Sequence, residues 1–370
     1  MTQPLNEDQE QFRAVVDRFL TDKSPTTQVR RLMETDRGYD AGVWKQLSQE
    51  LGLAGTHLPE IHGGFGFGPV ELGIVAEQMG RHLYCGPWFS SSVMAGSMLM
   101  LGADEQGRES CLPGIASGES IATLVLDDLT APARVGQHIH ADLLSEGATL
   151  SGHAGIVTDA HVADLLIVVA GTGTGRGLFS VAPDTAGVEI TPLQSIDPTR
   201  KLCRVNFEAA AAIPLGELSE AAMEAAWDYM SMALAFELIG SAQVLFDSTI
   251  DYMKMRVQFG RTIASFQALK HKSADLLLEL ELAKATVRQS AHELANGGQE
   301  PWLCSMAKAM AADACMSVAR SAIQLRGGIG FTWENDTHLW FKRAKSSEVF
   351  LGSPYEHRER VMQMMERSVA

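Results

Sequence analysis

The hydrophobic pattern of this chain changes twice, which divides its 370 residues into a helical, a β and a second helical part. Apolar residues recur at helical spacing from Asn6 to about Ser117, at strand-like spacing from Ser120 to about Gly216, and at helical spacing again from Glu217. A helical, β, helical order is not that of an alternating βα fold. We therefore predict an α+β protein of several domains. They are a helical domain over residues 1–118, an antiparallel β domain over 119–216 and a helical bundle over 217–370.

The first and last parts carry the signals of helix ends and loops. Asn6 or Asp8 can cap a first helix, and residues 70–82 return to helical spacing after an interruption. Residues 58–69 contain four glycines and two prolines, which cannot hold a helix, so we predict a loop there. The last part contains four helix-sized segments, which predict a four-helix bundle, at residues 218–256, 265–296, 301–325 and 336–366.

Short β-prone runs fill the middle part. They lie at residues 121–126, 165–169, 178–182 and 202–207. Strands of this length and spacing predict an antiparallel sandwich or barrel. The tract from Gly171 to Gly177 mimics a nucleotide-binding glycine pattern, but no helix follows it, so we interpret it as a hairpin turn.

The composition argues against several classes of partner. A formal net charge of −15 does not suit a nucleic-acid surface or a basic membrane-binding patch, since both need clustered Lys and Arg. Residues 1–8 lack the basic and apolar segments of a secretory signal, and Glu237 interrupts the run that comes closest to membrane-spanning length. The five cysteines are odd in number and lack metal-ligand spacing. We therefore expect buried thiols in a reducing cytosol, no metal, and no membrane or nucleic-acid partner.

Glu237 is the only carboxylate between Asp228 and Asp247, in a stretch that has no Lys, Arg or His and is apolar on almost every face. Such a stretch predicts a helix that is packed on its whole circumference. Burying a carboxylate there costs several kcal/mol unless the group is paired or protonated. Two interpretations stay open, namely a base of raised pKa that serves a reaction, or a carboxylate bonded to an arginine of another helix.

Three glycine-containing segments stand out in the last part. They are Arg256-Val-Gln-Phe-Gly-Arg261, Gln324-Leu-Arg-Gly-Gly-Ile-Gly330 and Leu351-Gly-Ser-Pro-Tyr-Glu-His-Arg358. In the second, three glycines within four positions at a helix end let the backbone approach a ligand closely. These segments are therefore candidates for a cofactor site.

Together with Leu58-Pro-Glu-Ile-His-Gly-Gly-Phe-Gly66 and Asp197-Pro-Thr-Arg200, these segments and their order resemble the acyl-CoA dehydrogenase flavoprotein family over nearly the whole chain. Lys342-Arg-Ala344 and the last of the three segments resemble a bacterial subgroup associated with sterol and bile-acid side-chain degradation. The resemblance implies the acyl-CoA dehydrogenase fold, with an N-terminal helical domain, a central β domain and a C-terminal four-helix bundle. It also implies FAD, bound between two subunits.

The resemblance assigns roles to single residues. Arg256 matches the arginine that holds the FAD pyrophosphate, and a guanidinium fork suits that role. Thr158 aligns with the threonine that touches the flavin ring, although Ile156 replaces the usual tryptophan. The other cofactor contacts fall on Phe259, Gln267, Gln324, Gly327 and Gly328. The structural alternative is an arginine that caps a helix and glycines that only turn the chain.

Two departures from the family pattern bear on catalysis. The family's Gly-Ser-Asp motif is absent from residues 126–134, and members that lost such pieces often work with a paralogue in an α2β2 assembly. Leu351 occupies the family's usual base position, and leucine cannot take a proton. The best-known alternative position falls on Met230, and Glu237 lies seven residues further on roughly the same helix face, so Glu237 is the candidate base. Weaker candidates are Glu356 and Glu334.

The expected function is FAD-dependent α,β-dehydrogenation of an acyl-CoA thioester, in which a carboxylate removes the α proton and the flavin accepts the β hydride. The resemblance implies a bulky, sterol-like acyl group, an electron-transfer flavoprotein or similar acceptor, and a homo-oligomer or an α2β2 assembly. One alternative is a non-catalytic subunit that completes the flavin site of a paralogue. Another is a flavin-dependent oxidase or monooxygenase on the same fold.

Overall fold

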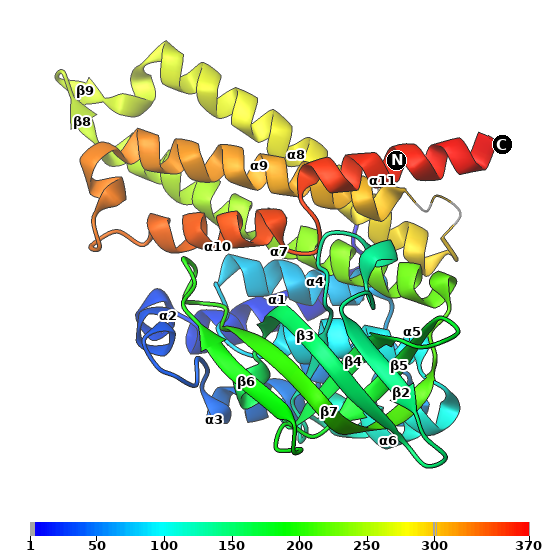
Figure 1. Ribbon diagram of the computed structural model, residues 1–370. Helices are drawn as coiled ribbons and strands as arrows, with labels where there is room; N and C mark the ends of the chain where they lie inside the picture. Colours follow the sequence, from blue (N-terminus) through cyan, green and yellow to red (C-terminus); the bar gives the residue numbers. More distant parts are fainter. Residues whose placement is uncertain (1–3, 299, 301, 370) are drawn as a thin grey trace. The chain divides into compact units, whose positions relative to one another are not determined.

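The computed structural model describes residues 4–298, 300 and 302–369, and the chain forms two compact units (Figure 1). The bundle unit contains Met1–Val29, Gly73–Tyr84 and Ser231–Ala370, and the sheet unit contains Arg30–Leu72 and Cys85–Met230. Along the chain, helices come before strands and helices return from Glu220, so the predicted helical, β, helical order is confirmed. The domain boundaries at 118/119 and 216/217 stay a prediction.

The N-terminal part of the chain is built from short helices. Asn6 caps α1 (Glu7–Lys23), because its side-chain oxygen accepts a 2.8 Å hydrogen bond from the Gln9 backbone and its own N–H donates to the Gln9 side chain. The predicted loop holds only the short turns of its 3₁₀ segment, and α4 (Pro69–Arg81) begins at its last proline, where the missing N–H is harmless. The other helices here are α2 (Thr26–Met33), α3 (Ala41–Lys45), α5 (Ser97–Gly102) and α6 (Glu105–Ser117), with π-helical segments at Gln46–Glu50 and Phe89–Gly96 and 3₁₀ segments at Leu53–Gly55 and Glu60–His62.

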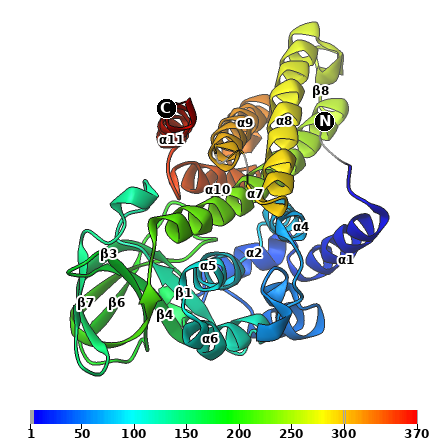
Figure 2. The same ribbon diagram turned by 90° about the vertical axis from the view of Figure 1, so that its right-hand side faces the viewer.

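Strands of the sheet unit pair in a closed ring in the order β4, β2, β3, β7 and β5, so this unit contains a barrel (Figure 2). Strand β1 extends it beside β4, and β6 beside β7. The bounds are β1 (Ala122–Val125), β2 (Ile139–Leu143), β3 (Ala148–Thr158), β4 (Leu165–Gly171), β5 (Arg176–Val181), β6 (Val188–Leu193) and β7 (Leu202–Glu217). Alternate residues of β7, such as Cys203, Val205 and Phe207, point into the buried core of the barrel, as the period of two predicts.

The prediction of an antiparallel β domain needs one correction. Strand β1 pairs with β4 in parallel, with Ala122 opposite Leu165, and β2 meets β4 in parallel at one residue pair. Strands β1 and β4 are joined by a crossover that contains β2 and β3, which is the long kind of connection that parallel pairs require.

The glycine tract between β4 and β5 forms a hairpin, as predicted. Gly171 lies opposite Arg176 in the antiparallel ladder, and the Thr172 N–H donates a 2.8 Å hydrogen bond to the Gly175 carbonyl. No helix follows the tract, so its glycines turn the chain between two strands.

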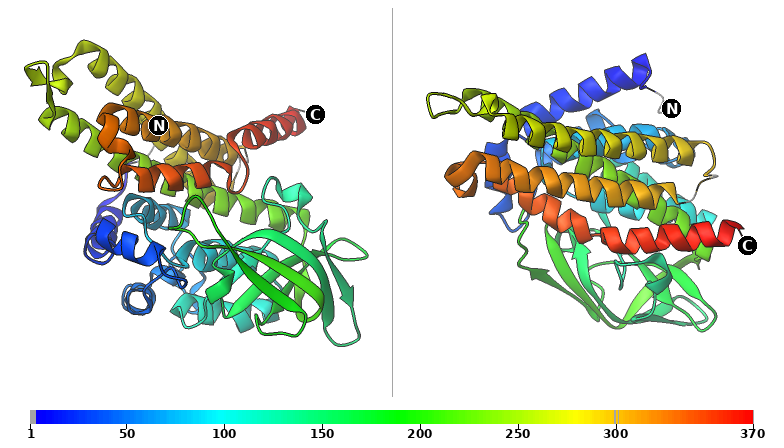
Figure 3. Two further views of the ribbon diagram at one scale, coloured as in Figure 1. Left: turned by 60° about the vertical axis from the view of Figure 1, so that its left-hand side comes forward. Right: turned by 90° about the horizontal axis from the view of Figure 1, so that it is seen from above.

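The C-terminal part is made of long helices, and here the prediction of four segments needs a correction. The fourth segment is two helices, α10 (Thr337–Val349) and α11 (Pro354–Val369), because Leu351 (φ 55°) and Gly352 (φ 95°) take left-handed conformations between them. The others are α7 (Glu220–Met255), α8 (Gln267–Ala295) and α9 (Leu303–Arg326), and α8 and α9 pack side by side in opposite directions (Figure 3). A small hairpin of β8 (Val257–Gln258) and β9 (Arg261–Thr262) joins α7 to α8.

Helix α7 is long and apolar enough to cross a membrane by length and composition alone. However, 78% of its most apolar window is buried inside the protein. That burial is typical of a helix in a protein core, as the apolar circumference around Glu237 predicts.

Within the bundle unit, α4 and α7 cross in direct backbone contact through glycines. A methyl group added at Gly80 of α4 would lie 2.0 Å from the carbonyl oxygen of Glu237, and one added at Gly240 of α7 would lie 2.0 Å from the carbonyl oxygen of Glu77. The Ser241 hydroxyl also donates a 3.0 Å hydrogen bond to the Gly80 carbonyl. Only glycine fits at these two positions, since any Cβ would overlap the facing backbone.

Candidate functional site

Glu237 of α7 lies where α4, α9 and α10 meet that helix. Its Oε1 accepts a 3.2 Å charged hydrogen bond from the Arg343 guanidinium of α10, and both residues are 3% exposed. Burial raises the pKa of the Cys315 thiol on α9, and the negative charge of Glu237 adds to that rise. Of the two interpretations left open by the sequence, the structure shows the ion pair with an arginine of another helix.

The ion pair bears directly on whether Glu237 can act as a base. Arg343 compensates for taking the carboxylate out of water, so the burial of Glu237 is explained without a reaction. A substrate would have to reach a side chain that is 3% exposed and share it with a guanidinium. The geometry therefore gives Glu237 a structural role, and its role as a base stays a prediction.

Leu351 lies in the turn between α10 and α11, and buried polar side chains hold that turn. Lys308 Nζ donates to the carbonyl oxygens of Glu348 (2.8 Å) and Gly352 (2.7 Å), and His357 Nε2 lies 2.8 Å from the carbonyl oxygen of Leu351. Burial lowers the pKa of Lys308 to about 7 and that of His357 to about 3, where the positive charge of Lys308 adds to the effect. The Leu351 side chain itself is fully buried and offers no proton acceptor.

The two weaker base candidates have other surroundings. The Glu356 carboxylate accepts a 2.6 Å hydrogen bond from the Ser353 backbone N–H at the start of α11, which is a capping role. Glu334 is exposed and lines a cavity of about 330 Å³ in the bundle unit. Residues that share this lining include Ser248 of α7, Arg326 of α9 and Trp340 of α10.

The residues matched to FAD contacts in the C-terminal part gather at one end of the bundle unit. The β8–β9 hairpin carries Phe259, and the C-terminal end of α9 leads into the 3₁₀ segment Gly327–Phe331 beside it (Figure 1). The Tyr252 hydroxyl on α7 joins the two segments by donating a 3.3 Å hydrogen bond to the Arg326 carbonyl oxygen. Six of the predicted residues are exposed here, namely Arg256, Phe259, Gln267, Gln324, Gly327 and Gly328.

This exposed end fits a nucleotide with a diphosphate. Among the described residues, the Arg256 guanidinium has no hydrogen-bond or ion-pair partner, so its donors are available to an anion. Cβ atoms at Gly327 and Gly328 would meet nothing within 4 Å, so a ligand can approach this backbone closely. Phe259 is 91% exposed at φ 54°, an apolar surface that the single chain does not cover.

Thr158 belongs to the sheet unit and has a different environment. It is 2% exposed, its hydroxyl lies 3.8 Å from the Met94 sulfur, and its carbonyl oxygen accepts a 2.6 Å hydrogen bond from the Thr123 hydroxyl. Ile156, two residues before it, is 46% exposed. The structure thus buries the Thr158 side chain, and a flavin contact there stays a prediction.

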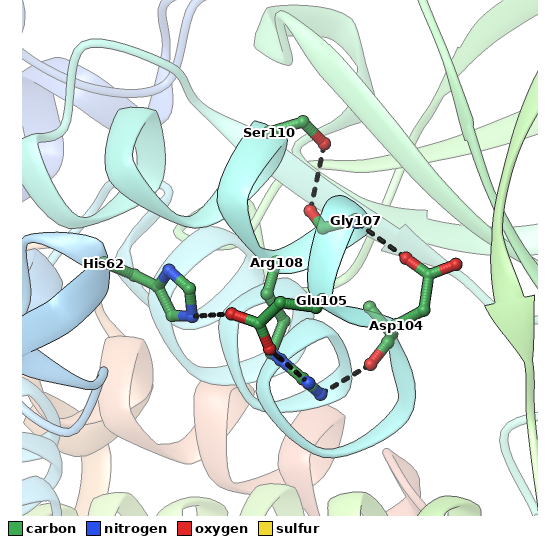
Figure 4. A network of polar contacts seen from close by, with 7 residues as sticks. His62, Asp104, Glu105, Gly107, Arg108 and Ser110 are labelled. Atoms are coloured by element: carbon green, nitrogen blue, oxygen red, sulfur yellow. Dashed lines mark hydrogen bonds and ion pairs between the residues drawn. The ribbon is translucent and has the colours of Figure 1, made fainter.

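A polar network in the sheet unit ties the glycine-rich loop to α6 (Figure 4). His62 Nε2 lies 3.7 Å from a Glu105 carboxylate oxygen, and the Arg108 guanidinium donates to the other oxygen of that carboxylate at 2.7 and 3.2 Å. The hydrogen bond from Arg108 holds the pKa of Glu105 below its usual range. Asp104 caps α6 by accepting a 2.7 Å hydrogen bond from the Gly107 N–H. We interpret this network as structural, because the Glu105 carboxylate is paired with the Arg108 guanidinium and the His62 ring.

We expect the protein to lose stability in mild acid because of His57 in the sheet unit. Its ring is 5% exposed, Nε2 lies 2.9 Å from the Ser97 hydroxyl, and burial lowers its pKa from 6.5 to about 4. His57 binds a proton below pH 6.5 in the unfolded chain but only below about pH 4 in the folded chain. The free energy of unfolding is therefore highest above pH 6.5 and falls as the pH decreases from 6.5 towards 4. Urea titrations should show the wild type losing about 2 kcal/mol more than His57→Gln between pH 7.5 and pH 5. Equal losses in the two proteins would contradict the prediction.

The sequence did not predict the contacts of two buried arginines near the candidate site residues, Arg343 and Arg326. Arg343 stands inside the quoted Lys342-Arg-Ala344 segment, but its pairing with Glu237 joins positions 106 residues apart. Arg326 stands inside the glycine segment and is 7% exposed. Arg326 is a charged residue at the end of an otherwise apolar helix face, and this position could have indicated that it is buried.

Comparisons with known proteins cover nearly the whole chain. The family model described as "Acyl-CoA dehydrogenase, N-terminal domain" matches residues 6–119, and "Acyl-CoA dehydrogenase, C-terminal domain" matches residues 220–365. The chain is 32% identical to "Acyl-CoA dehydrogenase IpdE2" of Mycobacterium tuberculosis over 358 residues, which is 96% of either protein. These matches include both helical parts that the sequence resemblance relied on.

Solved structures share the fold. The "Tcur3481-Tcur3483 steroid ACAD" superposes with a TM-score of 0.89 at 26% identity, covering 98% of this chain and 99% of that one. The "ChsE4-ChsE5 complex" of Mycobacterium tuberculosis superposes with a TM-score of 0.89 at 24% identity, covering 98% of either chain, which shows the fold alone.

Proposed function

Because the chain belongs to the acyl-CoA dehydrogenase family, whose members use FAD, we propose that it takes part in the α,β-dehydrogenation of an acyl-CoA thioester as one subunit of an oligomer. One observation carries this proposal. The Arg256 guanidinium, which has no partner among the described residues, and the open glycine backbone at Gly327 and Gly328 are exposed at the same end of the bundle unit. A diphosphate is the kind of group that such donors hold.

In this proposal the chain's own residues bind and orient the nucleotide. Arg256 holds the diphosphate, while the backbone of Gly327 and Gly328 approaches it without side-chain obstruction. Exposed Phe259 offers an apolar surface that a second subunit or the nucleotide covers. When bound, FAD supplies the acceptor for the hydride that leaves the β carbon. The proton at the α carbon needs a base, for which Glu237 is this chain's candidate.

The acyl group we propose is steroid-derived. One support is the subgroup that the segments around Lys342 and Leu351 resemble. Another is the similarity to the solved structure of a steroid ACAD, which is 26% identical. We expect an electron-transfer flavoprotein or a similar acceptor to reoxidise the flavin, as the family resemblance implies. The test is the rate of flavin bleaching with steroid-derived and straight-chain acyl-CoA thioesters compared side by side.

A visible spectrum of the purified protein tests the proposed function. The expected result is flavin absorbance near unit stoichiometry that an acyl-CoA bleaches without oxygen. The same measurement is made after co-expression with a paralogous dehydrogenase subunit. A protein that stays colourless in both preparations would refute flavin binding by this chain.

A second candidate function is that of a non-catalytic subunit that completes a paralogue's flavin site. Two observations favour it, namely the fully buried Leu351 at the usual base position and the ion-paired Glu237. The absence of the Gly-Ser-Asp motif from residues 126–134 points the same way. Flavin that appears only with the co-expressed paralogue, and bleaching that survives every substitution of Glu237, would identify this function.

Glu237→Gln tests the base. Glutamine keeps an oxygen that can accept the hydrogen bond from Arg343 but does not take up a proton, so the variant should retain flavin and lose anaerobic bleaching. Glu356→Gln, which changes only a helix cap, should bleach like the wild type. Bleaching by Glu237→Gln at the wild-type rate would remove Glu237 from the mechanism, and melting curves show whether the variant is folded.

Arg256→Ala tests the cofactor end, by which we mean the end of the bundle unit that carries Arg256, the β8–β9 hairpin and Gly327–Gly328. Loss of a charge-assisted hydrogen bond to a phosphate should weaken FAD binding by about 10- to 100-fold in a fluorescence titration. Arg261→Ala is the matched control, because this guanidinium of the same hairpin stacks on the ring of Phe266, 4.0 Å away at the start of α8. Equal losses in the two variants would mean that the hairpin, and not the Arg256 guanidinium, binds the nucleotide.

A further inference from the structure

Arg326 ends α9 directly before Gly327 and turns its side chain into the protein toward α7. The residue is 7% exposed, and its carbonyl oxygen accepts the hydrogen bond from the Tyr252 hydroxyl at 3.3 Å. Its side chain therefore lies beside the last turns of α7 before Arg256, while its backbone begins the open glycine segment. Arg326 and Tyr252 together therefore connect the end of α7 to the open glycine segment.

The guanidinium makes a set of contacts that fixes the end of α7. Nη1 donates to the Thr249 hydroxyl at 2.5 Å, and Nη2 donates to the Ser248 hydroxyl at 2.9 Å. Its Cζ lies 5.7 Å from the centre of the Tyr252 ring. Tyr252 in turn accepts a 2.8 Å backbone hydrogen bond from Arg256 N, so the contacts of Arg326 extend to the start of the hairpin. The rigid guanidinium fork suits this geometry better than a lysine.

The partners of this guanidinium are neutral. Among the described residues, its hydrogen bonds go to two hydroxyls and to the Ala322 carbonyl, and no carboxylate lies within ion-pair distance. Glu334 and Asp336 line the same cavity of about 330 Å³ without forming an ion pair with it. Burial accordingly lowers the pKa of Arg326. A leucine or methionine would fill this site without the penalty of a buried, unpaired charge.

We propose that Arg326 is a positioning residue for the flavin nucleotide. It aligns the Arg256 hairpin with the Gly327–Gly328 backbone. Its charge, which no carboxylate in the described part of the chain neutralises, strengthens the attraction of that end for a diphosphate. This inference rests on the proposed binding of FAD at the same end. It explains why a costly charge is kept at a position that apolar packing could fill.

Arg326→Met removes the charge and keeps most of the side-chain volume. The expected result is a loss of FAD affinity of about tenfold, with a weaker dependence of affinity on salt and a melting temperature no lower than that of the wild type. Arg326→Lys keeps the charge without the fork, so it should recover the salt dependence and only part of the affinity. Arg320→Met, on an exposed position of α9, is the matched control and should bind like the wild type.

The outcomes separate this inference from the proposed function. A wild-type protein that binds no FAD, alone or with a co-expressed paralogue, overturns both. A wild type that binds FAD and an Arg326→Met variant with the same affinity and salt dependence overturn the inference alone. An Arg326→Met variant whose affinity falls only in proportion to a lower melting temperature also overturns it, because the role would then be structural.

Discussion

Gly240→Ala is expected to destabilise the bundle unit by about 3 kcal/mol, measured as the free energy of unfolding in urea. The added methyl group would lie 2.0 Å from the carbonyl oxygen of Glu77, and 2.9 Å from its carbonyl carbon. Backbone atoms cannot rotate away as a side chain can, so α4 and α7 must separate along their contact. Gly80→Ala should act in the same way, because its methyl group meets the backbone of Glu237.

Gly155→Ala is the control for this prediction. A methyl group there meets nothing within 4 Å, and its φ lies outside the left-handed range, so the change should be nearly neutral. The double variant Gly80→Ala with Gly240→Ala should cost less than the sum of the two, since both separate the same pair of helices. Stability of Gly240→Ala within 0.5 kcal/mol of the wild type would contradict the close contact.

Arg343→Met is expected to cost about 3–5 kcal/mol of stability, because it removes the guanidinium that compensates the buried Glu237 charge. Glu237→Met should cost a similar amount, because it removes the carboxylate that compensates the buried Arg343 charge. The double variant should return to near the wild type or above it, since a buried ion pair is often no better than apolar packing of similar volume. The coupling is read from a double-mutant cycle of urea denaturation curves.

Lys342→Met provides the control, because this neighbouring side chain stacks on the exposed Trp333 ring 4.8 Å away and not on Glu237. Its cost should stay below about 1 kcal/mol. Independent, additive costs at Glu237 and Arg343 would show that the two side chains do not stabilise each other.

Local signals in the sequence predicted the elements of this fold well. The cap at Asn6, the loop before α4 and the glycine tract between β4 and β5 each depend on a few neighbouring residues, so the sequence displays them directly. The parallel pairing of β1 with β4 could not be predicted in this way, because it depends on how distant strands close the barrel. The break between α10 and α11 depends on Leu351 taking a conformation that favours glycine.

In the candidate site, too, the sequence predicted features that depend on neighbouring residues and not those that depend on contacts between distant residues. The apolar stretch predicted that Glu237 is buried, but its partner on α10 is set by helix packing. The family resemblance named the candidate cofactor contacts, and the structure brings six of them to one exposed end. The contacts of Arg326 with Ser248 and Thr249 join residues more than 70 positions apart, so the sequence did not display them. The sequence therefore displays burial and local motifs, whereas the contacts between distant residues become visible only in the folded chain.

The glycine contact between α4 and α7 also sets the mechanics of the cofactor end. Helix α7 continues without a break from Gly240 to Met255, so Arg256 lies about 24 Å beyond the contact. A tilt of α7 by about 5° there would displace Arg256 by about 2 Å, enough to lose a hydrogen bond. A change in the contact at Gly80 and Gly240 would therefore be transmitted along α7 to the Arg256 guanidinium, far from the substituted glycine.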